Sequence, residues 1–129
     1  SFILKLNANG DFVWAKEIEA NVINSNINLL DIKVCGNSIY LTGSFLGTID
    51  VNPNSSVLNI TASSAGSGLI EKLDTAGNFQ WAKQINGAGT EFLQLDSLSN
   101  LYFSGNTFSS TFFHSLMALF PSNNFSTQI

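Results

Sequence analysis

The chain has 129 residues, of which 44% are hydrophobic and only 11% are charged, so it can form one domain with a sizeable core and is not a disordered tail. Its five positive charges are all lysines and stand against nine acidic residues; the net charge of −4 and the lack of a basic run exclude a nucleic-acid-binding surface. The apolar runs are too short to span a bilayer, and the single cysteine, Cys35, cannot form a disulfide framework within the chain.

Residues 1–18 are predicted to form a β-hairpin. Side chains alternate with a period of two over 2–6 and 12–16, which is typical of strands. Between the two runs lies Asn7-Ala-Asn-Gly10, where an Asn opens the turn and a Gly supplies the left-handed conformation that closes it.

A second hairpin is predicted from two stretches with strand patterning, 29–34 and 38–43. They are joined by the short turn sequence Cys35-Gly36-Asn37. The segment that follows, 44–67, is rich in Asn, Ser and Gly and is predicted to be a long inserted loop. No stretch of the sequence shows a convincing helical stripe of apolar residues with capping signals.

The first hairpin occurs again further along the chain. Residues 70–85 match residues 3–18 without a gap, and nine of the sixteen positions are identical. Equivalent positions in two copies point to a shared structural role, because each repeat unit of a repeat protein packs against its neighbours. The pairs expected to be structural in this hairpin are Trp14/Trp81 and Gly10/Gly77.

The second hairpin also has a counterpart, although the match is looser. The stretch 32–43 parallels the stretch 93–105, and this alignment brings two further structural pairs into register, Tyr40/Tyr102 and Gly43/Gly105. A third and weaker copy of the first hairpin is expected over 115–125.

These patterns predict an all-β protein made of consecutive four-stranded antiparallel blades of a β-propeller. We expect about two to two and a half blades in a partial propeller over 1–129, either open or fragmentary, because a closed propeller needs roughly four to eight blades. The expected parts are an outer hairpin of a first blade, a second blade that contains the inserted loop, and a third blade that diverges at its end: 1–18, 27–85 and 91–129.

The repeat resembles the SBBP β-propeller repeat of bacterial, largely extracellular proteins. The residues that carry the resemblance are Phe2-Ile-Leu-Lys-Leu through Gly10-Asp-Phe-Val-Trp-Ala-Lys16, followed by Ile39-Tyr-Leu-Thr-Gly-Ser-Phe-Leu-Gly-Thr-Ile-Asp50. The resemblance implies that the Tyr-x-Thr-Gly hairpin is the inner pair of a blade and that the Trp-Ala-Lys hairpin is the outer pair. It also implies a secreted or cell-surface location, and it supplies no catalytic residues.

The expected function is a non-catalytic scaffold or an adhesion and protein-binding module. Its expected partners are other blades of the same parent chain or further copies of this chain, and a protein or glycan ligand. The alternative is a lectin-like carbohydrate-binding module that closes by oligomerisation. An enzyme is a third and less favoured hypothesis; it would need carboxylates that converge on a central channel, for which Asp31, Asp50 and Asp96 are the candidates.

The inserted loop holds the best candidate ligand-binding residues. Oxygen-bearing side chains recur at alternate positions, namely Asp50, Asn52, Asn54 and Ser56. This spacing is like the first half of a calcium loop, but the Gly and the closing Glu of such a loop are replaced by Ser55 and Thr61. We therefore expect an Asn-rich turn and no cofactor, with calcium at Asp50, Asn52 and Asn54 as the less favoured alternative.

Overall fold

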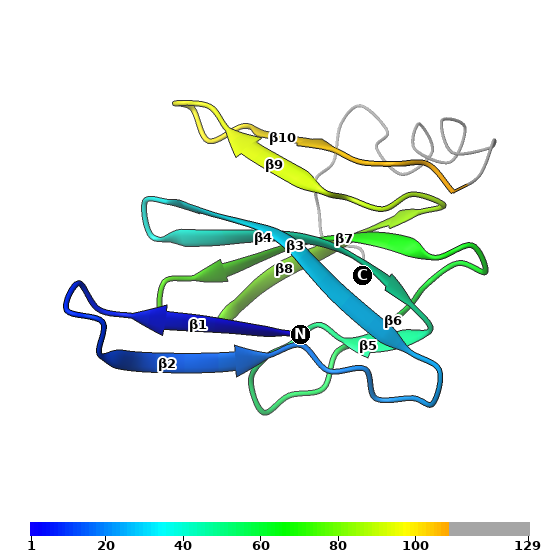
Figure 1. Ribbon diagram of the computed structural model, residues 1–129. Coiled ribbons are helices and arrows are strands. Elements are labelled where there is room, and N and C mark those ends of the chain that lie inside the picture. The colour runs from blue at the N-terminus through cyan, green and yellow to red at the C-terminus, as the bar shows by residue number, and fades with distance from the viewer. Residues whose placement is uncertain (109–129) are drawn as a thin grey trace.

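A computed structural model describes residues 1–108, and over this range the chain is built from antiparallel β-hairpins (Figure 1). The strands are β1 (Phe2–Leu6), β2 (Phe12–Glu17), β3 (Asn26–Cys35), β4 (Ser38–Leu46), β5 (Thr48–Asp50), β6 (Asn59–Thr61), β7 (Ser67–Asp74), β8 (Phe79–Asn86), β9 (Phe92–Leu95) and β10 (Leu101–Ser104). The predicted all-β class with antiparallel strands is confirmed. The third copy of the hairpin, expected over 115–125, lies outside the described residues.

The centre of the molecule is a four-stranded sheet with the strand order β3-β4-β7-β8. All its strands are antiparallel to their neighbours, and β3 and β4 are joined by the short turn expected at Cys35-Gly36-Asn37. A bulge between Leu29 and Asp31 interrupts the pairing of β3 with β4. Next to the bulge lies Gly43, where a side chain would collide with the backbone carbonyl oxygen of Asn28, so this sheet position requires glycine.

The segment 44–67, which was expected to be a loop, is partly ordered into strands. Its first residues extend β4 to Leu46, and β5 and β6 form a small hairpin before β7 begins. Ile49 and Val51 of this insertion are fully buried. The insertion was misread because its Asn and Ser residues mask a short alternation of buried and exposed positions in each strand.

The hairpins lie in three layers (Figure 1). The β1–β2 hairpin covers one face of the four-stranded sheet, together with β5–β6, and the β9–β10 hairpin covers the opposite face. The larger hydrophobic core is formed between the sheet and the β1–β2 layer, where Ile3 and Ile18 pack with Leu69 and Leu73. A smaller cluster around Ile70, Ile85 and Ala88 lies on the other face.

The two copies of the repeated hairpin share their backbone details. In β1–β2 a bulge shifts the register between Lys5 and Leu6, and in β7–β8 the same shift occurs between Lys72 and Leu73. The turns also match: the Asn7 side chain accepts the backbone N–H of Asn9 and of Asp11, each at 2.9 Å, and Asp74 accepts the N–H groups at the equivalent two positions. The sequence match therefore corresponds to one recurring hairpin geometry.

The same five-residue turn occurs a third time, between β9 and β10. Here Asp96 accepts the backbone N–H groups of Leu98 and Asn100 at 2.9 and 2.8 Å. Ser99 takes the place of the glycine with a φ of 64°, whereas Gly10 and Gly77 have φ values of 87° and 82°. The side-chain cap therefore holds the turn even without glycine.

Candidate functional site

The four candidate ligand-binding residues lie in the connection between β5 and β6. Asp50 ends β5, and its Oδ1 atom accepts the backbone N–H of Asn52 at 3.0 Å and that of Leu58 at 2.8 Å. Asn52 in turn accepts the backbone N–H of Asn54 at 3.1 Å, and Ser56 is exposed. The side-chain oxygens of Asp50 and Asn52 therefore hold the loop in shape through consecutive Asx turns.

A lysine of the β1–β2 hairpin also reaches this loop. The Nζ atom of Lys16 donates to the side-chain oxygen of Asn54 at 2.9 Å. A positive charge at this oxygen disfavours a calcium ion beside it, because the two cations would repel each other. Within residues 1–108 no group of three or more His, Cys, Asp or Glu side chains is placed to hold a metal ion.

Substitutions of Asp50 distinguish the turn from a calcium site. Asp50→Asn keeps the accepting oxygen, so we expect it to change the free energy of unfolding by less than about 0.5 kcal/mol. Asp50→Ala removes both hydrogen bonds and should lower that free energy by about 2 kcal/mol. Urea unfolding with and without calcium checks both values. Stabilisation by calcium that is lost in Asp50→Asn would contradict the assignment of Asp50 to a turn.

The three carboxylates considered for an enzyme lie in separate elements. Asp31 is on β3, where the N–H of Leu93 donates to it at 3.0 Å and its Oδ1 lies 3.1 Å from the Nζ of Lys33. The backbone bond from Leu93, with the nearby Lys33, lowers the pKa of Asp31. Asp96 caps the β9–β10 turn, and hydrogen bonds from Asn100 lower its pKa. Asp50 lies in the β5–β6 insertion, so each of the three serves a different local structure.

The two tryptophans of the repeat lie at equivalent places but have different neighbours. Trp14 faces the four-stranded sheet, where its Nε1 atom donates to the carbonyl oxygen of Thr75 at 3.3 Å. Trp81 packs edge-on against Tyr40, with ring centroids 6.3 Å apart and planes inclined by 64°. Lys72 extends over the same Tyr40 ring, with its Nζ 5.4 Å from the centroid. Trp14 pairs with Lys5 and Trp81 pairs with Lys72 across the strands, so each tryptophan lies on the same face of its own hairpin.

The other structural pairs differ in how far the equivalence extends. Gly43 and Gly105 both lie where a side chain would collide with the backbone of a neighbouring segment. Tyr40 is buried, whereas its counterpart Tyr102 is exposed, and the hydroxyl of Tyr102 donates to Asp96 at 3.2 Å.

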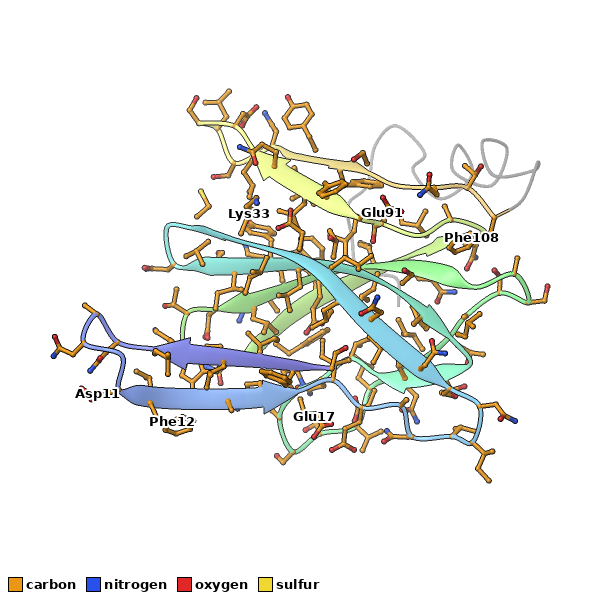
Figure 2. All side chains as sticks on the ribbon, viewed as in Figure 1. Asp11, Phe12, Glu17, Lys33, Glu91 and Phe108 are labelled. Atoms are coloured by element: carbon orange, nitrogen blue, oxygen red, sulfur yellow. The ribbon has the colours of Figure 1, made fainter. Side chains whose placement is uncertain are left out.

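A shallow groove lies between β3 and the β9–β10 hairpin. Its volume is about 380 Å³, and the residues that line it include Asp31 and Lys33 of β3 and Leu93 and Phe103 of the hairpin. Figure 2 shows Lys33 between these two layers. An aromatic ring beside hydrogen-bonding groups is a combination that can bind a polar ring compound such as a sugar.

The sequence analysis did not single out Glu71, which lies at the centre of β7. Its side chain is 0% exposed, and neither carboxylate oxygen has a hydrogen-bond partner. Burial, with a smaller contribution from the negative charge of Asp50, raises its pKa to about 8. A comparison of the two repeats could have identified Glu71. Leu4 occupies the equivalent position in the first hairpin, and a charged residue at this position breaks the apolar pattern of the strand.

Comparisons of the chain with known protein families, with curated proteins and with solved structures find no match. The resemblance to the SBBP repeat therefore rests on the residues of the chain alone. Residues 1–108 contain no helix of the length and hydrophobicity that a membrane crossing requires.

Proposed function

We propose that the chain is a segment of a β-propeller of the SBBP type, which serves as a non-catalytic scaffold or adhesion module of a bacterial protein outside the cell. The observation that carries the proposal is the way in which equivalent hairpins lie on one another. The outer hairpin β1–β2 lies on its own repeat, β7–β8, through Lys5 and Trp14, which both donate to the carbonyl oxygen of Thr75. Stacked repeats of this kind are how propeller blades bury their faces.

The inner hairpins are related in the same way. The β9–β10 hairpin lies on β3–β4, where the backbone of Leu93 bonds to Asp31 and the Thr90 hydroxyl lies 2.7 Å from the carbonyl oxygen of Gly43. In both pairs of hairpins, the hairpin of the later repeat lies on the same side of the hairpin of the earlier repeat. The layers are therefore stacked in one direction along the chain. A stack with one polarity is what a ring of blades requires.

A lectin-like function is the second candidate, and the groove beside Phe103 and Asp31 favours it. A glycan array probed with the purified 129-residue chain separates the two functions. The scaffold and adhesion function predicts no saturable binding to any glycan and saturable binding to a protein such as collagen or fibronectin. Binding of a sugar that is lost in Phe103→Ala would replace the proposal with the lectin-like alternative. Phe103 is 37% exposed, and thermal unfolding of Phe103→Ala shows whether this variant keeps the fold.

A further inference from the structure

We infer that a second copy of this chain binds to the outward face of the β1–β2 hairpin, and that copies add head to tail. The inference rests on the proposed stacking of the repeats. The outward face is defined here as the side of β1–β2 that points away from the four-stranded sheet, with Phe2, Leu4, Leu6 and Phe12 as its exposed apolar side chains. Figure 2 shows Phe12 on β2, at the side of the hairpin opposite the sheet.

The repeat identifies what would cover this face. The positions equivalent to the outward face are Leu69, Glu71, Leu73 and Phe79 of β7–β8. The first three are buried and Phe79 packs against the same core, because the opposite side of the β1–β2 hairpin lies on them. The contact of β1–β2 with β7–β8 is thus a complete interface inside the molecule. The outward face of β1–β2 is equivalent to the β7–β8 half of that interface and lacks the other half.

The turns show the same contrast between an occupied and an open half. A methyl group on Gly77 would lie 3.1 Å from Cε of Lys16 and 3.5 Å from the ring of Trp14, because these side chains cover the β7–β8 turn. At the equivalent Gly10 no atom lies within 4 Å of that position. A hairpin that carries the same Lys and Trp would fill the space over Gly10.

A second molecule offers that hairpin on its own β7–β8. Lys72, Trp81 and Lys83 are the counterparts of Lys5, Trp14 and Lys16. If they repeat the internal interface, Lys72 and Trp81 of the second copy donate to the carbonyl oxygen of Ala8, which is equivalent to Thr75.

The inner hairpins provide a matching second contact. On the side of the molecule that bears the outward face, β3 exposes Ile32 and Val34, at 47% and 65%. Their counterparts Leu93 and Leu95 belong to the β9–β10 hairpin, which lies on the opposite side of β3–β4. On the far side of β9–β10, Phe92 and Tyr102 are exposed. Both ends of the stack therefore present apolar groups that the repeat would pair with each other.

The contact uses different surfaces on the two molecules, so it does not close at a dimer unless the rotation between copies is two-fold. We expect the average mass of the purified chain to rise with concentration over about 1 µM to 1 mM, measured by sedimentation velocity. Phe12→Lys places a charge on the outward face, and Phe92→Lys places one at the other end of the stack. Every contact in a solution of one variant would include the altered face, so each variant alone should sediment as a monomer.

Mixing the two variants tests the head-to-tail geometry directly. Each retains one intact face, so an equimolar mixture should form a species of twice the monomer mass and grow no further. If two outward faces instead paired with each other, Phe92→Lys alone would dimerise and the mixture would contain no heterodimer. The control is Val57→Lys, because Val57 and Phe12 are both 68% exposed but Val57 lies in the β5–β6 insertion. The control should associate like the unmodified chain.

A chain that stays monomeric at all concentrations, or association that is unchanged by Phe12→Lys, would overturn the inference. Thermal unfolding of each variant shows whether the fold is retained. The stability of Ile3→Ala tests the stacking of hairpins within one molecule, on which the proposed function depends. Ile3 belongs to this internal stack and not to the outward face, so its effect does not depend on contacts between molecules. If Ile3→Ala is strongly destabilised but the unmodified chain stays monomeric, the contact between molecules is wrong and the stacking within the molecule stands.

Discussion

Replacing Glu71 with Leu should raise the free energy of unfolding at pH 9 by several kcal/mol. At that pH the folded chain must hold a charged carboxylate that is fully buried and has no hydrogen-bond partner. Leucine already occupies the equivalent position in the first hairpin, as Leu4, so the surrounding strand geometry accepts it. Urea unfolding curves of the two chains measure the difference directly.

The pH dependence has a definite sign. Glu71 has a pKa of about 8 in the folded chain against an ordinary value of 4.5, so between these values the folded state holds one proton more than the unfolded state. Stability from this group is therefore complete below about pH 4.5 and is lost as the pH rises through 8. At about 1.4 kcal/mol per pKa unit, the loss is on the order of several kcal/mol.

Two controls isolate the carboxylate. Glu71→Gln keeps the shape of the side chain and should abolish the loss of stability between pH 4.5 and 8. Glu17→Gln removes an exposed carboxylate on β2 and should leave the pH profile unchanged. A parent chain whose stability is flat from pH 5 to 9 would show that Glu71 has a partner or reaches water.

Replacing Ile3 with Ala should lower the free energy of unfolding by about 2–4 kcal/mol. Ile3 is 5% exposed and belongs to the core between the β1–β2 layer and the sheet, so the change leaves a cavity between two layers. The neighbouring residue supplies the matched control. Leu4 is 48% exposed on the opposite side of the same strand, and Leu4→Ala should change the free energy by less than about 1 kcal/mol.

Urea unfolding at pH 7 compares the two variants, at a protein concentration low enough to keep molecules apart. Equal effects of Ile3→Ala and Leu4→Ala would mean that β1–β2 does not lie on the sheet through its Ile3 side, and the proposed layers would fail with it.

The hairpins could be predicted because their signals are local. The alternation of side chains and the Asn or Asp at the start of each turn are enough to place β1–β2 and β7–β8. The duplication of sixteen residues shows that the second hairpin is a copy of the first. The short turn after Cys35 was also predicted, and with it the pairing of β3 with β4.

The rest depends on contacts between distant residues. The β5–β6 insertion is ordered because Ile49 and Val51 fill space beside the β1–β2 hairpin, which the composition of the segment does not reveal. The same holds for the candidate loop: its oxygens looked available as ligands, but Asp50 and Asn52 bond to backbone groups inside the loop. Conversely, Thr90 gave no sequence signal, yet it is buried, and its hydroxyl lies 2.7 Å from the carbonyl oxygens of both Gly43 in β4 and Leu69 in β7.

The β5–β6 hairpin, which packs on the core through Ile49 and Val51, affects how a stack of such similar layers reaches its correct order. Hairpins that carry the same residues on the same faces can pair one repeat out of place at little loss of free energy, as slipped strands do. Ile49 and Val51 fit beside β1–β2, and Lys16 reaches Asn54, which has no counterpart after the other inner hairpin. The insertion therefore makes the boundary between β1–β2 and the sheet different from the other boundaries between hairpins. Its removal should favour misassembled forms of the chain over the native arrangement.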